Sequence, residues 1–218
     1  MLVKKISTKS LTLETGEQLH LMESFYTIQG EGCHCGKAAY FIRLGGCDVG
    51  CHWCDTKDSW DVTKYPLVDV AQIANLCNCS TDQSVLPIAV ITGGEPLMYN
   101  LQPLCNVLHQ KGFKTHLETS GAYPLTGNWD WICFSPKKFK EPLPEIYPRA
   151  DELKIIIYNK SDFDWAECFA KKVNEKCRLF LQPEWSRSDI MLPVIVDYVK
   201  LNPEWKISLQ VHKFMNIP

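Results

Sequence analysis

The sequence contains no apolar run close to the roughly 20 residues that a membrane-spanning helix needs. Residues 1–10 also lack the apolar core of roughly 7–15 residues that marks a secretory signal peptide. We therefore expect no membrane span and no export, and predict a cytoplasmic protein.

Long runs of like charge are also missing. The chain has 23 Lys and Arg against 25 Asp and Glu, which gives a formal net charge of −2. A nucleic-acid-binding surface gathers positive charge to meet the phosphates, and nothing in this chain provides it. We expect no nucleic-acid partner and a small-molecule substrate.

Internal repeats, low-complexity segments and linkers are absent as well. The 218 residues are 45% hydrophobic and include seven tryptophans, enough to build one core. Residues 1–18 are polar and threonine-rich, typical of an N-terminal extension or hairpin. We predict a single core domain over residues 19–218.

Cysteine, in contrast, is abundant. Eleven cysteines are an odd number, which does not suit a disulfide framework, and the chain has no export signal. Both features favour a reducing compartment with free thiols. Cys33 and Cys35 together with Cys77 and Cys79 could form a second metal site, although free cysteine is commonly a small buried hydrophobic residue.

Three cysteines stand in Cys-x3-Cys-x2-Cys spacing at Cys47, Cys51 and Cys54, directly after Gly45-Gly46. Thiolates are the ligands that iron–sulfur clusters and zinc prefer, and neighbouring glycines allow a tight wrap. Three thiolates on a four-iron cluster leave one iron open for chemistry. The alternatives are a zinc site completed by His52 or a remote cysteine, and buried free thiols.

The apolar patterns predict an α/β fold, because strands and helices alternate. We expect strands at 19–27, 38–44, 88–91, 114–118, 131–134, 152–158, 178–181 and 206–211, and helices at 66–76, 100–111, 162–176 and 188–201. Polar motifs follow these strands at 92–96, 118–121, 135–137 and 182–184, with His212 after the last. Since the carboxyl ends of parallel strands share one edge, we expect these motifs to converge there.

Several single residues allow two interpretations. Arg43 could clamp a carboxylate or form a strand-end salt bridge. The loop Gln29–Gly32 could bind a ligand or be an ordinary turn. Thr56 taken alone is more often a helix cap, and His212 a hydrogen-bonded core histidine.

The cysteine motif, followed by Thr92-Gly93-Gly94-Glu95-Pro96, resembles the radical S-adenosylmethionine (SAM) superfamily. Residues 25–32, 41–47 and 53–56, and then 92–96, 118–121, 135–137 and 209–218, resemble the 7-carboxy-7-deazaguanine synthase family in order. The resemblance runs from about residue 20 to Pro218.

This resemblance implies a partial (β/α) barrel of mostly parallel strands. It implies conversion of 6-carboxy-5,6,7,8-tetrahydropterin to 7-carboxy-7-deazaguanine with loss of ammonia, with SAM used catalytically. The implied cofactors are a [4Fe–4S] cluster, SAM and Mg²⁺. The implied partners are a second copy of the chain, in a homodimer, and an electron donor such as a flavodoxin.

The resemblance also implies roles for particular residues. Cys47, Cys51 and Cys54 would be the catalytic cluster ligands, and Thr56 would bind Mg²⁺. The SAM-binding residues would be Trp53, Cys54, Asp55, Gly94, Glu95, Ser135, Pro136, Lys137, Gln182, Pro183, Glu184 and Trp185. The substrate-binding residues would be Ile28, Gln29, Gly30, Glu31, Arg43, Thr92, His212 and Pro218, the last through its terminal carboxylate.

Two other functions share part of this signature. A glycyl-radical-enzyme activase has the same cysteine spacing and a Gly-Gly-Glu segment, but it needs neither Gln29–Glu31 nor a defined chain end. A non-enzymatic zinc or iron–sulfur binding module, such as an electron carrier, would not need the segment Gly93–Pro96.

Overall fold

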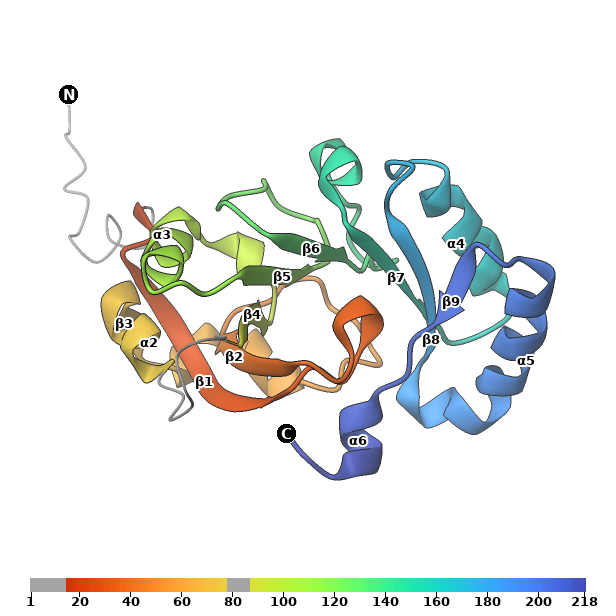
Figure 1. Ribbon diagram of the computed structural model, residues 1–218, viewed down its shortest axis with the longest axis horizontal. Coiled ribbons are helices and arrows are strands. Elements are labelled where there is room, and N and C mark those ends of the chain that lie inside the picture. Colours follow the sequence, from red (N-terminus) through yellow and green to blue (C-terminus); the bar gives the residue numbers. More distant parts are fainter. Residues whose placement is uncertain (1–14, 78–86) are drawn as a thin grey trace.

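The computed structural model describes residues 15–77 and 87–218. The strands are β1 (Gln18–Ile28), β2 (Ala38–Leu44), β3 (Leu67–Asp69), β4 (Ile88–Gly93), β5 (Thr115–Thr119), β6 (Trp131–Phe134), β7 (Glu152–Ile157), β8 (Arg178–Pro183) and β9 (Trp205–Ile207). The α-helices are α2 (Val70–Leu76), α3 (Gln102–Gln110), α4 (Ser161–Ala170), α5 (Ser188–Leu201) and α6 (Val211–Met215) (Figure 1).

Within the described ranges, nine strands form one sheet in the order β3-β1-β2-β4-β5-β6-β7-β8-β9. From β2 to β9 each strand is parallel to its neighbour, while β1 runs antiparallel to β2 and to β3. The order is open, because β3 and β9 are both edge strands. The predicted α/β fold with a partial, mostly parallel barrel is confirmed. Residues 1–14 of the predicted N-terminal extension lie outside the described residues, so that boundary stays a prediction.

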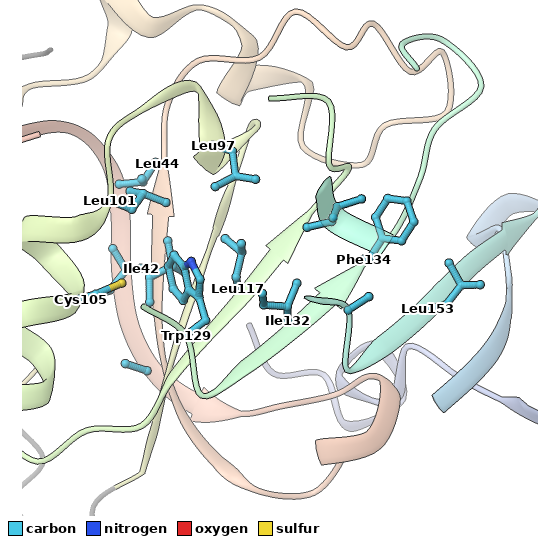
Figure 2. Close-up of a cluster of buried hydrophobic side chains, with 14 of the residues drawn as sticks. Ile42, Leu44, Leu97, Leu101, Cys105, Leu117, Trp129, Ile132, Phe134 and Leu153 are labelled. Atoms are coloured by element: carbon cyan, nitrogen blue, oxygen red, sulfur yellow. The ribbon is translucent and has the colours of Figure 1, made fainter. Parts of the chain in front are cut away.

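Side chains alternate between the two faces of this sheet, as the two-residue period of a strand requires. In β2, Ile42 and Leu44 join the main hydrophobic core, while Phe41 and Arg43 face the other side and line a cavity. Figure 2 shows core residues of neighbouring strands, including Ile42, Leu117 and Ile132, gathered in one cluster. Each fully buried side chain of this kind contributes about 1.5–3 kcal/mol.

Helices cover the core face of the sheet and leave the cavity face open. Helix α3 contacts β5, α4 contacts β7, and α5 contacts β8 and β9. In Figure 1, α2 and α3 lie at one end of the sheet and α4 and α5 at the other. The packed face is therefore structural, and the opposite face is available for a site.

The helix predicted over residues 66–76 is wrong in its first turn. Leu67–Asp69 form β3 and pair with Gln18, Leu19 and His20 of β1, and the helix begins only at Val70. The helical spacing of the apolar residues is real. Pairing with a distant strand decided the conformation of this segment, and a local pattern cannot report such pairing.

Two further elements differ from the prediction. The strand expected over 206–211 ends at Ile207, and Val211 begins α6 instead. The helix expected over 162–176 is α4, which ends at Ala170. The helix begins at Ser161, and the Asp162 carboxylate in its first turn accepts the N–H groups of Tyr158 and Asn159.

Candidate active site

A cavity of about 290 Å³ lies at the carboxyl ends of the parallel strands. The predicted site residues that line it are Ile28, Gln29, Gly30, Glu31, Arg43, Cys47, Cys51, Trp53, Cys54, Asp55, Thr56, Thr92, Gly94, Glu95, Ser135, Lys137, Gln182, Pro183, Glu184, Trp185, His212 and Pro218. Pro136 is buried and does not line the cavity. The predicted convergence is confirmed, and the roles of the individual residues stay predictions.

The loop that carries Cys47, Cys51 and Cys54 turns at two glycines. Gly46 and Gly50 have φ angles of +101° and +76°, values that L side chains rarely adopt. All three thiols face the same cavity. Burial raises the pKa of Cys47 and raises that of Cys51 to about 11, so both thiols stay protonated until a metal displaces the proton.

This arrangement fits an iron–sulfur cluster held by three thiolates, with one side open toward the cavity. The alternative that His52 completes a zinc site gains no support, because the His52 ring packs against Phe139 and Tyr158, with ring centroids 5.3 and 5.6 Å apart. His52 does not line the cavity.

The segment Gly93–Glu95 is joined directly to the cysteine loop. The N–H of Gly94 donates to the Leu44 carbonyl at 2.9 Å, and the N–H of Glu95 donates to the Gly46 carbonyl at 2.9 Å. A Cβ atom at position 94 would lie 2.1 Å from the Gly46 oxygen. Glycine is therefore required at position 94 for the two motifs to meet.

We expect Gly94→Ala to lower the free energy of unfolding by at least about 3 kcal/mol, because the new methyl group meets backbone that cannot move aside cheaply. Gly36→Ala is the matched control: Gly36 also has a positive φ, +88°, but nothing lies within 4 Å of its added Cβ. The control should cost only about 1–2 kcal/mol, the usual penalty of a left-handed residue. Urea unfolding of both apo proteins measures the difference, and equal costs would contradict the close contact.

The Glu95 carboxylate is 2% exposed and points into the protein. One oxygen accepts the Leu97 N–H at 3.1 Å and the Thr119 hydroxyl at 2.6 Å. The other accepts the backbone N–H of Ser120 at 2.8 Å and its hydroxyl at 2.5 Å. Glu95 therefore fastens the Gly-Gly-Glu-Pro segment to the end of β5, whatever contact it makes with a cofactor.

The loop Gln29–Gly32 packs more closely than an ordinary turn does. Two of its glycines lie directly against the side chains of His212 and Glu152. A Cβ at Gly30 would lie 2.4 Å from the His212 ring, and a Cβ at Gly32 would lie 2.0 Å from the Glu152 carboxylate. Gly32 also has a φ of +62°. These glycines let the loop sit deep enough to present Glu31 to the cavity.

The salt-bridge interpretation of Arg43 is confirmed, and a role as carboxylate clamp stays a prediction. Its Nε donates to the Glu23 carboxylate at 2.6 Å, as the pairing of these residues across β1 and β2 allows. The same side chain lines the cavity. The salt bridge fixes the Nε edge of the guanidinium at the cavity wall.

The predicted SAM-binding residues after β6 and β8 lie together. Lys137 donates to the Ser135 hydroxyl at 2.5 Å, and its Nζ lies 5.6 Å from the centre of the Trp53 ring. Burial lowers the pKa of Lys137. Gln182 is buried and accepts the Ser208 hydroxyl at 2.7 Å, while Trp185 is 43% exposed.

Thr56 occupies the N-cap position of a short 3₁₀ helix, Lys57–Trp60, but its side chain makes no capping bond. Its hydroxyl donates to Asp55 at 3.2 Å, and its N–H donates to the Cys54 sulfur at 3.4 Å. Thr56 lines the cavity beside the cysteine loop. A magnesium ion that takes one protein ligand and completes its shell with substrate and water fits this position.

The last residues fold back onto the cavity. The N–H of Val211 donates to the Gly30 carbonyl at 2.9 Å, and the Thr27 hydroxyl donates to a Pro218 oxygen at 3.2 Å. Burial lowers the pKa of His212, so its ring is neutral near pH 7. Both His212 and Pro218 therefore line the cavity beside the loop Gln29–Gly32.

Among the cavity residues absent from the predicted site, three carry polar side chains that meet at Glu31: Glu118, Lys154 and Gln210. Lys154 bridges Glu31 and Glu118, and Gln210 donates to Glu31. Lys154 had a usable signal, since it is the only charge between Leu153 and Ile157 in an apolar strand, just as Arg43 is in β2. No such signal pointed to Gln210, because that residue was expected within the strand 206–211.

Comparison with known proteins decides the family. The model of a family described as a 4Fe-4S single cluster domain matches residues 28–128. The chain is 54% identical to the 7-carboxy-7-deazaguanine synthase of Flavobacterium psychrophilum over 218 residues, the full length of both chains. The chain belongs to the 7-carboxy-7-deazaguanine synthase family.

Other members of the 7-carboxy-7-deazaguanine synthase family agree. The Synechocystis synthase is 47% identical over 197 residues, which cover 90% of this chain and 92% of that one. The crystal structure of QueE from Escherichia coli matches with a TM-score of 0.77 and 29% identity, over 95% of this chain and all of that chain.

Membership of the synthase family confirms the predicted class and cofactors. The chain is a radical SAM enzyme of 7-deazapurine biosynthesis that uses a [4Fe–4S] cluster, SAM and Mg²⁺. The activase and the non-enzymatic module are not favoured. Within the described residues, no helix is long and apolar enough to cross a membrane.

Proposed function

We propose that this chain converts 6-carboxy-5,6,7,8-tetrahydropterin to 7-carboxy-7-deazaguanine with loss of ammonia, using SAM catalytically. One observation carries the proposal. A single cavity has the three thiols and the Gly-Gly-Glu-Pro segment on one side, and the acidic loop Gln29–Glu31 with the chain end on another. That arrangement gives a cluster, a SAM molecule and a small polar substrate one shared space.

On the cluster side, Cys47, Cys51 and Cys54 would hold the [4Fe–4S] cluster. When bound, the cluster and SAM supply the radical that removes a hydrogen atom from the substrate. Gly94, Ser135 and Lys137 would hold SAM beside the cluster.

On the substrate side, Gln29, Gly30 and Glu31 would read the amide and amine edge of the pterin. Matched donors and acceptors of this kind reject analogues far better than shape does. Arg43, and Mg²⁺ on Thr56, would meet the substrate carboxylate. Thr92, His212 and the Pro218 carboxylate would complete the contacts.

The direct test is an anaerobic assay of the reconstituted chain. The protein, rebuilt with iron and sulfide, is mixed with SAM, Mg²⁺, a reductant and 6-carboxytetrahydropterin, and products are identified by mass spectrometry. The proposal predicts 7-carboxy-7-deazaguanine and ammonia in equal amounts. Deoxyadenosine without a pterin product would overturn the substrate assignment.

Two residues added after Pro218 should raise the KM for the pterin at least tenfold, because the terminal carboxylate becomes an amide and loses its charge. The loss of one charge-assisted hydrogen bond, worth about 1.5–3 kcal/mol, accounts for a rise in KM of this size. The KM for SAM should move far less, since SAM binds on the cluster side. The same two residues added before Met1 are the control. An unchanged pterin KM in the C-terminal variant would contradict a role for the Pro218 carboxylate.

The compartment, the oligomeric state and the electron donor of the enzyme are inferred from the family resemblance. We propose a cytoplasmic homodimer that receives its electron from a flavodoxin-like donor. An oxygen-sensitive cluster needs a reducing compartment, which supports the cytoplasm.

A further inference from the structure

Lys154 is a buried cation that lines the cavity, and the sequence motifs assign it no role. It stands on β7, between the core residues Leu153 and Ile155, and its side chain is 6% exposed. Its Nζ lies 2.6 Å from one oxygen of Glu31 and 2.9 Å from one oxygen of Glu118. The two carboxylates come from the loop after β1 and from β5, so one ammonium ties together three separate parts of the sheet.

These contacts close into a ring of hydrogen bonds. The second Glu118 oxygen accepts a hydrogen bond from Nε2 of the Gln29 side chain at 3.4 Å. The Oε1 atom of the same side chain accepts the backbone N–H of Glu31 at 3.1 Å. Outside the ring, the second Glu31 oxygen accepts from Gln210 at 2.9 Å. Neither carboxylate can turn without breaking a bond to a neighbour.

The exposed fractions of the side chains indicate which members of the hydrogen-bonded ring can contact a ligand. The side chains of Glu31 and Glu118 are 17% and 21% exposed, against 6% for Lys154. Each carboxylate oxygen can accept two hydrogen bonds, so the two acids keep free acceptor positions on the cavity side. The ammonium lies behind them and already has two partners.

Other titratable groups also face this ring: the Lys137 ammonium after β6 acts on Lys154 and Glu118, and Cys35 after the first 3₁₀ turn acts on Glu31. Glu152 on β7 and Cys133 on β6 lie beside Lys154, while His212 on α6 acts on Glu31. Burial alone would raise the pKa of Glu31, but the charge and hydrogen bond of Lys154, with help from Gln210 and His212, lower it to about 2. Burial raises the pKa of Glu152, so this third acid competes less for the ammonium.

We propose that Lys154 is a positioning residue that holds Glu31 and Glu118 as a fixed pair of ionised acceptors for the N–H donors of the substrate's aminopyrimidinone ring. This inference rests on the proposed function, since it names how the same cavity recognises its substrate. Lys154 does not touch the reacting atoms. It sets the charge and direction of the groups that read the ring.

The consequence is a dependence on pH that appears only when Lys154 is lost. With Lys154→Met, Glu31 keeps its burial and loses its main counter-charge, so its pKa rises above the ordinary value, as buried carboxylates do by as much as 3–5 units. A protonated Glu31 presents one acceptor oxygen fewer. Affinity should then be retained at high pH and fall as the pH drops through the new pKa, by up to about tenfold per unit.

The test uses 7-carboxy-7-deazaguanine itself as the ligand, because it keeps the aminopyrimidinone edge and needs no turnover. Its Kd for the reconstituted enzyme with SAM is measured by anaerobic equilibrium dialysis between about pH 5.5 and about pH 8.5, the range in which a buried carboxyl titrates. The wild-type profile is the reference for the ligand's own ionisation. Lys154→Met should weaken binding at least tenfold more at the low end than at the high end.

Three variants separate this effect from general damage. Lys206→Met, an exposed lysine on β9, is the matched control and should follow the wild type. Glu31→Gln cannot ionise, so it should bind weakly with the wild-type pH profile. Lys154→Arg keeps the charge and should also keep that profile. If the methionine variant takes up no cluster, the arginine variant decides, because a role in packing alone predicts that the larger side chain weakens binding at every pH.

The inference is overturned if Lys154→Met binds as the wild type does at every pH, or is weakened equally at every pH. It is also overturned if Lys154→Arg is weakened equally throughout. Failure of the proposed function gives a different result, since the wild-type enzyme would then bind no 7-carboxy-7-deazaguanine and convert no pterin.

Discussion

Replacement of Cys51 by alanine is expected to reduce pterin conversion to background and to remove the visible absorption of the cluster. In the proposed site the protein would hold the cluster through three thiolates, so the loss of one would leave only two. The fold should survive, because Cys51 lies at the cavity and not within the main core. Iron and sulfide content per chain, with turnover, measures the effect.

Two other cysteines provide the controls for this substitution. Cys168 is exposed and lies outside the cavity, so Cys168→Ala should change nothing. Cys105 is fully buried in the core, so Cys105→Ala should cost stability, about 1 kcal/mol for a small lost group, and leave the cluster intact. Turnover by Cys51→Ala with a normal iron content would contradict the assignment of the cluster ligands.

Glu95→Ala is expected to lower the free energy of unfolding by about 3–5 kcal/mol. The change removes the acceptor for two backbone N–H groups and two hydroxyls in a region that water does not reach. Each buried donor left unpaired costs about 1–3 kcal/mol, partly offset because a buried charge is also removed. Urea unfolding of the apo protein measures the loss.

Glu145→Ala is the matched control for Glu95. Glu145 also accepts a backbone N–H, that of Leu125 at 2.6 Å, but it is exposed. Water can replace its carboxylate, so the cost should stay near or below about 1 kcal/mol. Similar costs for the two substitutions would mean that the Glu95 hydrogen bonds do not hold the segment in place.

Much of the fold could be predicted from local patterns. Ala38–Leu44 is found as a strand at the predicted residues, because aromatic and β-branched residues fit a pleated, half-buried surface. The alternation of strands and helices was enough to predict a mostly parallel sheet. Convergence of the polar motifs followed from parallel topology alone, since carboxyl ends share an edge.

What failed depended on partners distant in the sequence. Leu67–Asp69 is a strand because β1 lies beside it, and residues after Ile207 leave the sheet to cross the loop at Gly30. The four internal hydrogen bonds of Glu95 could not be predicted from the sequence, while its contact with SAM stays a prediction. Lys154 escaped notice because its two partners lie 123 and 36 residues away.

The most direct test of the central claim is the amount of 7-carboxy-7-deazaguanine formed by the reconstituted enzyme when SAM is limiting. A site that holds cluster, SAM and pterin in one shared cavity predicts many products per SAM and little free deoxyadenosine, because SAM is regenerated in place. One product or fewer per SAM, with an equal amount of deoxyadenosine, would contradict that account.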